Sequence, residues 1–371
     1  MATDDVFGQK YVLLRKLAEG GMAEIYLARQ IGLGGFQKEL VIKRIHQALA
    51  DNQQYVELFL DEARIAANLN HPNIVHIYDI GRAFATFYIA MEYIRGPDLA
   101  DIAKRAVSQG APLAPQRAVE ILCQVAEGLH FAHSYRDKDG RSLRIIHRDI
   151  SPSNILVTYG GICKLVDFGI AKARTQLHDD SGALMGKLGY MAPELLEGHP
   201  ADARTDLFSL GVVLYEITVG KRLYVGEDSV VARKILHDPI PPPSVWVEDY
   251  PSELEVVVMR LLEKRPENRY QDADELQQDL RDIMTDLGWP TGPIPLGRYL
   301  TDLFDLDAEE LDLDEMQVEE EDDLGLDDDV ELDLGPDEPT IRGAPPSAPE
   351  GDEAEDDELI FASRLPDPFD D

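Results

Sequence analysis

The sequence has few cysteines and few basic residues. Its 371 residues include only two cysteines, Cys123 and Cys163, which lie far apart and outside any C-x-x-C or Cys/His cluster. This pattern indicates neither a disulfide framework nor a zinc site. Lys and Arg number 35 against 71 Asp and Glu, which gives a formal net charge of −36. Because affinity for nucleic acid depends on cations that neutralise phosphates, this balance argues against a nucleic acid partner.

The sequence also lacks a long apolar run. The longest one, residues 207–219, contains Ser209 and Glu216, and it fits a buried helix better than the roughly 18 apolar residues of a membrane span. The first residues, Met1–Asp5, include two acidic side chains and do not resemble a signal peptide. We therefore expect a cytoplasmic protein without a membrane span.

Most of the acidity lies at the carboxyl end. Residues 301–371 hold 30 acidic side chains and only Arg342 and Arg364 as basic ones, a local charge of 2 − 30 = −28, whereas residues 1–300 carry 33 − 41 = −8. Low-complexity sequence of this kind cannot bury enough apolar surface to offset the entropy of ordering. We expect a linker over residues 286–300 and a disordered acidic tail over 301–371. This tail either binds partner proteins or only increases solubility.

Hydrophobic periodicity divides the remainder into two parts. Alternation and glycine breaks predict strands near residues 11–14, 25–28, 40–43, 74–80 and 87–93, and helical spacing predicts one helix over 55–69. Beyond Gly96 and Pro97 the pattern turns helical, with helices expected over 116–134, 206–219, 254–262 and 272–287. The expected fold class is α+β, with a strand-rich lobe followed by a mainly helical lobe.

Three motifs occur in a fixed order within this frame. His147-Arg148-Asp149, with Asn154 five residues after the aspartate, precedes Asp167-Phe168-Gly169 and then Ala192-Pro193-Glu194. Together they resemble the protein kinase family over about residues 8–285, with an N-lobe of about 8–94 and a C-lobe of about 97–285. Ser151-Pro152 and an inserted segment at 134–146 resemble the bacterial, eukaryotic-like (Hanks-type) serine/threonine kinases. The resemblance implies a bilobal kinase fold that transfers the γ-phosphate of ATP to Ser/Thr hydroxyls of protein substrates.

The resemblance assigns roles to five polar residues. Asp149 would orient the attacking hydroxyl and accept its proton. Asn154 and Asp167 would hold Mg²⁺, or Mn²⁺ in its place, through hard oxygen atoms. Lys43 would bind the α- and β-phosphates of ATP and pair with Glu62 on the following helix. The preceding residue, Asp61, would lie about 100° away around that helix, so only one of the two carboxylates can face Lys43.

The ATP pocket is less regular than the family pattern. Against G-x-G-x-x-G, the sequence has Ala18, Gly20 and Ala23, with Gly21 as an additional glycine. Alanine has fewer allowed backbone angles than glycine but still permits close approach of the backbone, so we expect the chain to bind ATP. By resemblance, the residues that line the ATP site are Ala18, Gly20, Gly21, Ala23, Ile25, Val41, Lys43, Met91, Glu92 and Ile94. Met91 would stand beside the adenine and Glu92–Ile94 would form the hinge. A role for Val41 and Met91 as ordinary core residues is compatible with this one, because the adenine pocket is an extension of the core.

Two positions depart from the family pattern. Serine/threonine kinases usually carry a lysine where this sequence has Ser151, and a threonine where it has Lys187. We infer that Lys187 returns the missing positive charge to the γ-phosphate. The alternative is that Lys187 is merely solvated and the enzyme is slow or inactive. Because Lys43, Asp149, Asn154 and Asp167 are all retained, an active kinase is favoured over a pseudokinase that serves as an ATP-binding scaffold.

Other residues have expected structural or regulatory roles. Asp206 would fasten the backbone of the loop that holds His147, and Glu194 would form a buried ion pair with Arg269. Arg148 could pair with a phosphate on the activation segment through charge-assisted hydrogen bonds. The candidates for autophosphorylation there are Thr175 and Ser181, whereas Tyr190 is expected to be packed.

Overall fold

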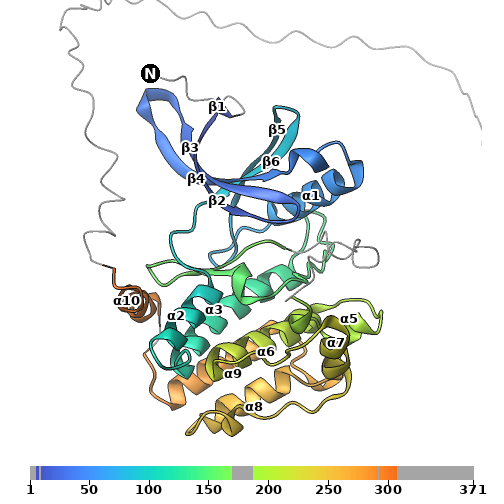
Figure 1. Cartoon of the computed structure of the whole chain (residues 1–371), viewed down its shortest axis with the longest axis vertical. Helices are drawn as coiled ribbons and strands as arrows, with labels where there is room; N and C mark the ends of the chain where they lie inside the picture. The colour runs from blue at the N-terminus through green and yellow to red at the C-terminus, as the bar shows by residue number, and fades with distance from the viewer. Residues whose placement is uncertain (1–5, 8–9, 169–186, 291, 307–371) are drawn as a thin grey trace, which may run out of the picture. The chain divides into compact units, whose positions relative to one another are not determined.

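An antiparallel sheet of six strands forms the amino-terminal lobe (Figure 1). The computed structural model describes residues 6–7, 10–168, 187–290 and 292–306. The strands are β1 (Val6–Phe7), β2 (Tyr11–Glu19), β3 (Ala23–Ile31), β4 (Gln37–Ile45), β5 (Ile77–Ala83) and β6 (Thr86–Glu92), in the order β1-β2-β3-β4-β6-β5. All five strands expected from the sequence in this lobe are therefore present, and only the two-residue β1 was not predicted.

Helix α1 (Gln53–Ala66) covers one face of this sheet. It begins at Asn52, whose side chain accepts a hydrogen bond from the Gln54 N–H. Its buried residue Phe59 packs in one cluster with Val41 from β4 and Ile89 from β6. Because successive strand residues point to opposite faces, the neighbours of Val41 contribute to a separate cluster on the other face.

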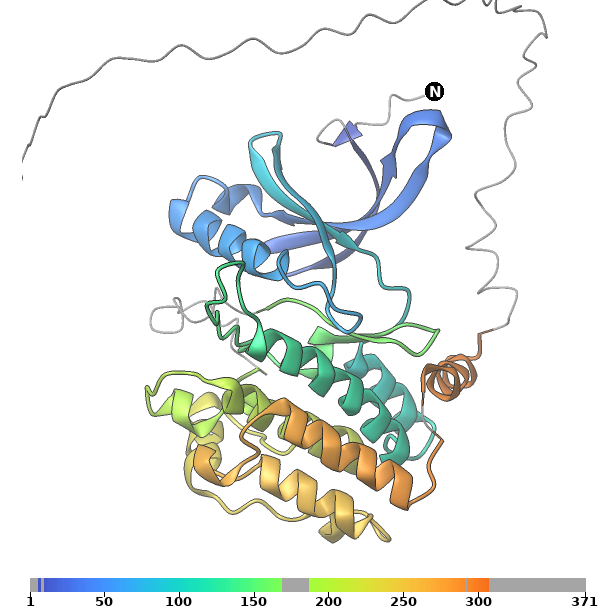
Figure 2. The same ribbon diagram turned by 180° about the vertical axis from the view of Figure 1, so that it is seen from behind.

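The carboxyl-terminal lobe is built mainly from helices (Figure 2). They are α2 (Leu99–Ser108), α3 (Pro115–Ser134), α5 (Pro193–Leu196), α6 (Ala203–Val219), α7 (Asp228–His237), α8 (Ser252–Leu261), α9 (Ala273–Asp286) and α10 (Pro293–Leu303). A short hairpin joins β7 (Ile155–Val157) to β8 (Cys163–Leu165). Short 3₁₀ turns occur at Leu33–Gly35, Gln47–Leu49, Pro152–Asn154, Leu188–Tyr190, Pro243–Val245 and Pro266–Asn268.

Helix α6 lies at the centre of this lobe. All of its residues from Thr205 to Val219 are buried, which explains why its sequence is apolar on nearly every side. A capping box between Asp202 and Thr205 starts the helix, and Gly220, with φ 73°, ends it. The bilobal α+β architecture expected from the sequence is confirmed, and none of the described helices is both long and apolar enough to cross a bilayer.

The linker expected over residues 286–300 is wrong, because α10 occupies most of it. Leu296, Leu300 and Leu303 of α10 are buried in the core of the helical lobe. Burial of these leucines overrides the weak helix propensity of a segment with two prolines and a glycine. The ordered body therefore continues to residue 306, and the rest of the expected acidic tail, residues 307–371, lies outside the described residues.

Candidate active site

Lys43 lies between two carboxylates from different parts of the chain. Its Nζ is 2.8 Å from Glu62 Oε1 on α1 and 2.8 Å from Asp167 Oδ1, which follows β8. The side chains of Lys43 and Glu62 are only 12% and 15% exposed. Asp61 instead contacts Arg64 on the outside of α1, at 3.0 Å. The structure thus brings together three residues that the sequence places up to 124 positions apart.

The charges of Lys43 and Asp167 stabilise each other. Burial alone would lower the pKa of Lys43, but the adjacent Asp167 and Glu62 carboxylates outweigh burial and raise that pKa. Burial would raise the pKa of Asp167, and the Lys43 and Lys187 cations overcome it and hold that pKa below its ordinary value. Asp167 is therefore ionised at neutral pH, the state in which a carboxylate binds a divalent cation.

Asp206 of α6 holds the backbone of the loop before Asp149. Its two oxygens accept hydrogen bonds from the His147 and Arg148 N–H groups, both at 2.8 Å. His147 is fully buried, with Nε2 3.1 Å from the Val166 carbonyl oxygen and Nδ1 accepting from the Asp149 N–H at 3.3 Å. His147 thus packs as a scaffold for Asp149.

Asn154 and Lys187 both donate hydrogen bonds to Asp149. Asn154 Nδ2 donates to the Asp149 backbone oxygen at 2.7 Å and to Oδ2 at 2.8 Å, and Lys187 Nζ donates to Oδ2 at 3.0 Å. Because Asn154 Nδ2 is engaged, Oδ1 is the amide atom that can bind a cation. Asn154 immediately precedes β7 and Asp167 follows β8, so the pairing of Ile155 with Leu165 sets both at one end of the hairpin.

Ser151 and Lys187 have different surroundings. Ser151 is only 2% exposed, and its hydroxyl oxygen lies 3.2 Å from the hydroxyl oxygen of Ser153. Lys187, in contrast, is 38% exposed and contacts Asp149. Lys187 therefore places a positive charge beside Asp149, and Ser151 places none there.

An apolar cluster adjoins this charged group. The expected pocket residues Ala23, Val41, Met91 and Ile94 are buried in it, and Ile25 packs against its edge. Val41 and Met91 are cross-strand partners on β4 and β6. Leu156 of β7 packs against the same cluster from the other lobe. Leu156 was not predicted as a pocket residue from the sequence, although it lies only two residues after the expected metal ligand Asn154.

The glycine-containing loop forms a tight turn between β2 and β3. The Gly20 N–H donates to the Ala23 carbonyl oxygen at 2.9 Å, and nothing lies within 4 Å of a Cβ built on Gly21. Ala18 stands on β2 opposite Ile25. At the hinge, the Glu92 carboxylate accepts from Lys164 Nζ at 2.8 Å. The Glu92 N–H donates to the His76 carbonyl oxygen at 2.9 Å, so Glu92 can meet a ligand through its backbone carbonyl oxygen.

Two further expectations concern the helical lobe. Arg269 forms a bidentate ion pair with Glu194, at 2.9 and 2.8 Å, and the Arg269 side chain is fully buried. Tyr190 is 6% exposed and donates to Glu216 at 2.7 Å, so it is packed as predicted. Thr175 and Ser181, the predicted autophosphorylation sites, lie outside the described residues.

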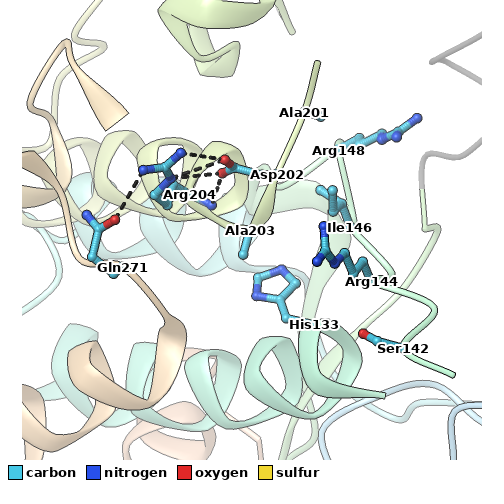
Figure 3. A pocket seen from close by; sticks show the side chains of 10 residues that line it. All are labelled: His133, Ser142, Arg144, Ile146, Arg148, Ala201, Asp202, Ala203, Arg204 and Gln271. Carbon is cyan, nitrogen blue, oxygen red and sulfur yellow. Dashed lines mark hydrogen bonds and ion pairs between the residues drawn. The ribbon is translucent and has the colours of Figure 1, made fainter. Parts of the chain in front are cut away.

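A separate cavity of about 620 Å³ lies beside the chain segment that leads to Asp149, with Arg148 in its wall (Figure 3). Arg148, Arg144 and His133 line it, together with the ion pair between Arg204 and Asp202. Its lining includes neither Lys43 nor Asp149, so it is distinct from the charged group described above.

Comparison with known proteins identifies the class. Residues 11–280 match the protein kinase domain family, well over half of the chain. The chain belongs to this family, and its relatives place it among the bacterial Hanks-type protein kinases.

Individual relatives differ in their named specificity. The chain is 42% identical over 292 residues to "Tyrosine-protein kinase MasK" of Myxococcus xanthus, covering 78% of this chain and 45% of the relative. It is 37% identical over 289 residues to "Serine/threonine-protein kinase PknB" of Mycolicibacterium smegmatis, covering 76% and 44%. The kinase domain of PknI from Mycobacterium tuberculosis superimposes with a TM-score of 0.56 at 26% identity, covering 76% of this chain and 98% of that one. The chain spans less than half the length of MasK and of PknB.

Proposed function

We propose that this chain is an active protein kinase that transfers the γ-phosphate of ATP to Ser/Thr hydroxyls of proteins. The observation that carries the proposal is the Lys43 ion pair with both Glu62 and Asp167 at 2.8 Å. Catalysis of phosphoryl transfer depends on positioning and on charge stabilisation around the phosphates. An ion-paired lysine beside an ionised carboxylate supplies both.

Each residue of the site then has one task. ATP with Mg²⁺ would supply the phosphoryl group and neutralise its developing charge when bound. Lys43 holds the phosphates, while Asn154 Oδ1 and Asp167 provide oxygen ligands for the cation. Asp149, fixed by Asn154, orients the acceptor hydroxyl and takes its proton. The apolar cluster around Val41 receives the adenine.

Lys187 supplies the cation that Ser151 lacks. It lies 3.0 Å from Asp149 Oδ2, next to where the acceptor hydroxyl must be oriented. A unit charge about 4 Å from a phosphate oxygen interacts by roughly 4 kcal/mol at an effective dielectric constant of 20. This supports a role for Lys187 in stabilising the phosphoryl oxygens during transfer.

The acceptor class rests on the names of relatives. The PknB proteins are named serine/threonine kinases, and they support Ser/Thr acceptors here. MasK is named a tyrosine kinase, which makes a tyrosine acceptor the competing outcome. A pseudokinase scaffold is disfavoured because it has no use for the retained charged set.

The proposal also includes regulation by autophosphorylation and the binding of partner proteins. Autophosphorylation of Thr175 or Ser181 would place a phosphate where Arg148 could bind it. The acidic residues of the tail would bind basic partner proteins.

A transfer assay tests this proposal. Wild-type chain and Asp149→Asn are incubated with γ-labelled ATP, Mg²⁺ and generic Ser/Thr and Tyr acceptors, followed by phosphoamino acid analysis. We expect phosphoserine or phosphothreonine from the wild type and a loss of roughly a hundredfold or more in Asp149→Asn. The exposed Asp139→Asn is the matched control. Phosphotyrosine alone would reassign the acceptor, and no transfer by the wild type would contradict the proposal.

A further inference from the structure

Helix α10 lies beyond the residues that match the kinase family, yet it is part of the helical lobe. Leu296, Leu300 and Leu303 occur at spacings of four and three residues, so they share one face of the helix. All three are buried, and α10 lies beside α2 in both views (Figures 1 and 2). An element outside the common domain is thus built into the core.

Two glycines allow α10 to touch the backbone of the β7–β8 turn. A Cβ built on Gly297 would lie 2.5 Å from the Tyr159 carbonyl oxygen, closer than real Cβ atoms come to other atoms. A Cβ on Gly161, in the turn, would overlap the Pro293 carbonyl oxygen, and Gly161 has a φ of 81°. The contact between α10 and the turn therefore depends on glycine on both sides.

The other end of α10 is fastened to α2. Arg105 Nε and Gln109 Nε2 donate to the Leu303 carbonyl oxygen at 2.9 and 3.1 Å. Arg105 also forms an ion pair with Asp305 at 2.6 Å. Donors from α2 and from Gln109, the residue after it, thus bind a carbonyl at the carboxyl end of α10, where helix carbonyls lack partners within the helix.

The same turn and hairpin contact the nucleotide site. The Tyr159 N–H donates to the Arg95 carbonyl oxygen, just after the hinge, at 3.1 Å. Leu156 of β7 packs in the cluster that holds Val41 and Met91. The hairpin therefore lies between α10 and the expected adenine pocket.

We propose that α10 is a brace that positions the β7–β8 hairpin and thereby sets the affinity of the nucleotide site. Gly297 is the positioning residue in this arrangement, because it permits the backbone contact. The inference rests on the proposed function, since it requires a site that binds adenine nucleotides. Loosening the brace should displace the Leu156 side of the pocket, whereas Asp149 keeps its two hydrogen bonds from Asn154 Nδ2 and follows a backbone that Asp206 of α6 holds.

The test is Gly297→Ala in the full chain. Alanine in a helix interior is normally stabilising relative to glycine, so a harmful effect here must come from the contact with Tyr159. We expect the Kd for Mg-ADP, measured by titration calorimetry at a temperature where circular dichroism shows a folded protein, to rise about threefold to tenfold. The KM for ATP should rise by the same factor with kcat unchanged. The exposed neighbour Arg298→Ala should match the wild type.

A second variant keeps the inference testable if Gly297→Ala does not fold. Arg105→Ala removes the ion pair with Asp305 and should shift the Mg-ADP Kd in the same direction, with partial recovery in Arg105→Lys. A folded Gly297→Ala that binds Mg-ADP as tightly as the wild type would overturn the brace. So would a fall in kcat at unchanged KM. Failure of the wild type to bind Mg-ADP would instead contradict the proposed function.

Discussion

His147 shows how one buried side chain links the loop of Asp149 to pH. Its Nδ1 accepts from the Asp149 N–H, so the ring is neutral, with its proton on Nε2 next to the Val166 carbonyl oxygen. Burial is the main cause that lowers the pKa of His147 from 6.5. Protonation would add a charge in the core and remove the hydrogen bond to Asp149.

This predicts a pH-dependent stability. Below pH 6.5 the unfolded chain binds a proton at His147 that the folded protein does not, so this contribution is complete above pH 6.5 and is lost as pH falls toward the lowered pKa. The loss is at most about 1.4 kcal/mol per pH unit. In urea unfolding at pH 7 and pH 5.5, the wild type should therefore lose more stability than His147→Phe. Equal losses in the two proteins would refute this account of His147.

At the scale of elements, α10 extends the body of the helical lobe beyond α9. A chain cut after residue 306 keeps Leu303 and Asp305, whereas a cut after residue 290 removes the whole helix. Burial of each leucine contributes about 1.5–3 kcal/mol, so removing α10 should lower the free energy of unfolding by about 5 kcal/mol or more. The cut after 306 should leave stability and basal activity unchanged and alter only the choice of partner.

Urea unfolding and the transfer assay on both truncated chains measure this difference. Equal stability of the two truncations would show that α10 contributes nothing to the body. Loss of activity after the cut at 306 would show that the acidic tail acts on the catalytic body.

The same helix shows what the sequence could not predict. Strands such as β3 and β4 were predictable because their alternation is local. Helix α10 contains Pro293, Pro295 and Gly297, and it is stable through burial against distant residues. The spacing of Leu296, Leu300 and Leu303 is typical of one face of a helix, but it lies next to the acidic low-complexity sequence, and a linker was predicted instead.

At the scale of the whole molecule, the motifs predicted which residues meet but not all of their surroundings. The resemblance to the kinase family was enough to expect the pair of Lys43 with Glu62, which the structure shows at 2.8 Å, but the second ion pair of Lys43, with Asp167 at 2.8 Å, was not predicted. Contacts across the lobes, such as that of Leu156 with the Val41 cluster, depend on tertiary packing and leave no periodic trace.

The central claim is that the group of Lys43, Asp149, Asn154 and Asp167 performs phosphoryl transfer, with Lys187 supplying the charge that a lysine at position 151 would give. The most direct measurement is the single-turnover rate of phosphate transfer from Mg-ATP by the wild type, Lys187→Ala and Lys187→Arg, with the exposed Lys104→Ala as control. We predict that Lys187→Ala is about a hundredfold slower with nearly unchanged Mg-ATP affinity, because the lost charge acts mainly in the transition state. Lys187→Arg should recover part of the rate. Transfer by Lys187→Ala at the wild-type rate would contradict the claim.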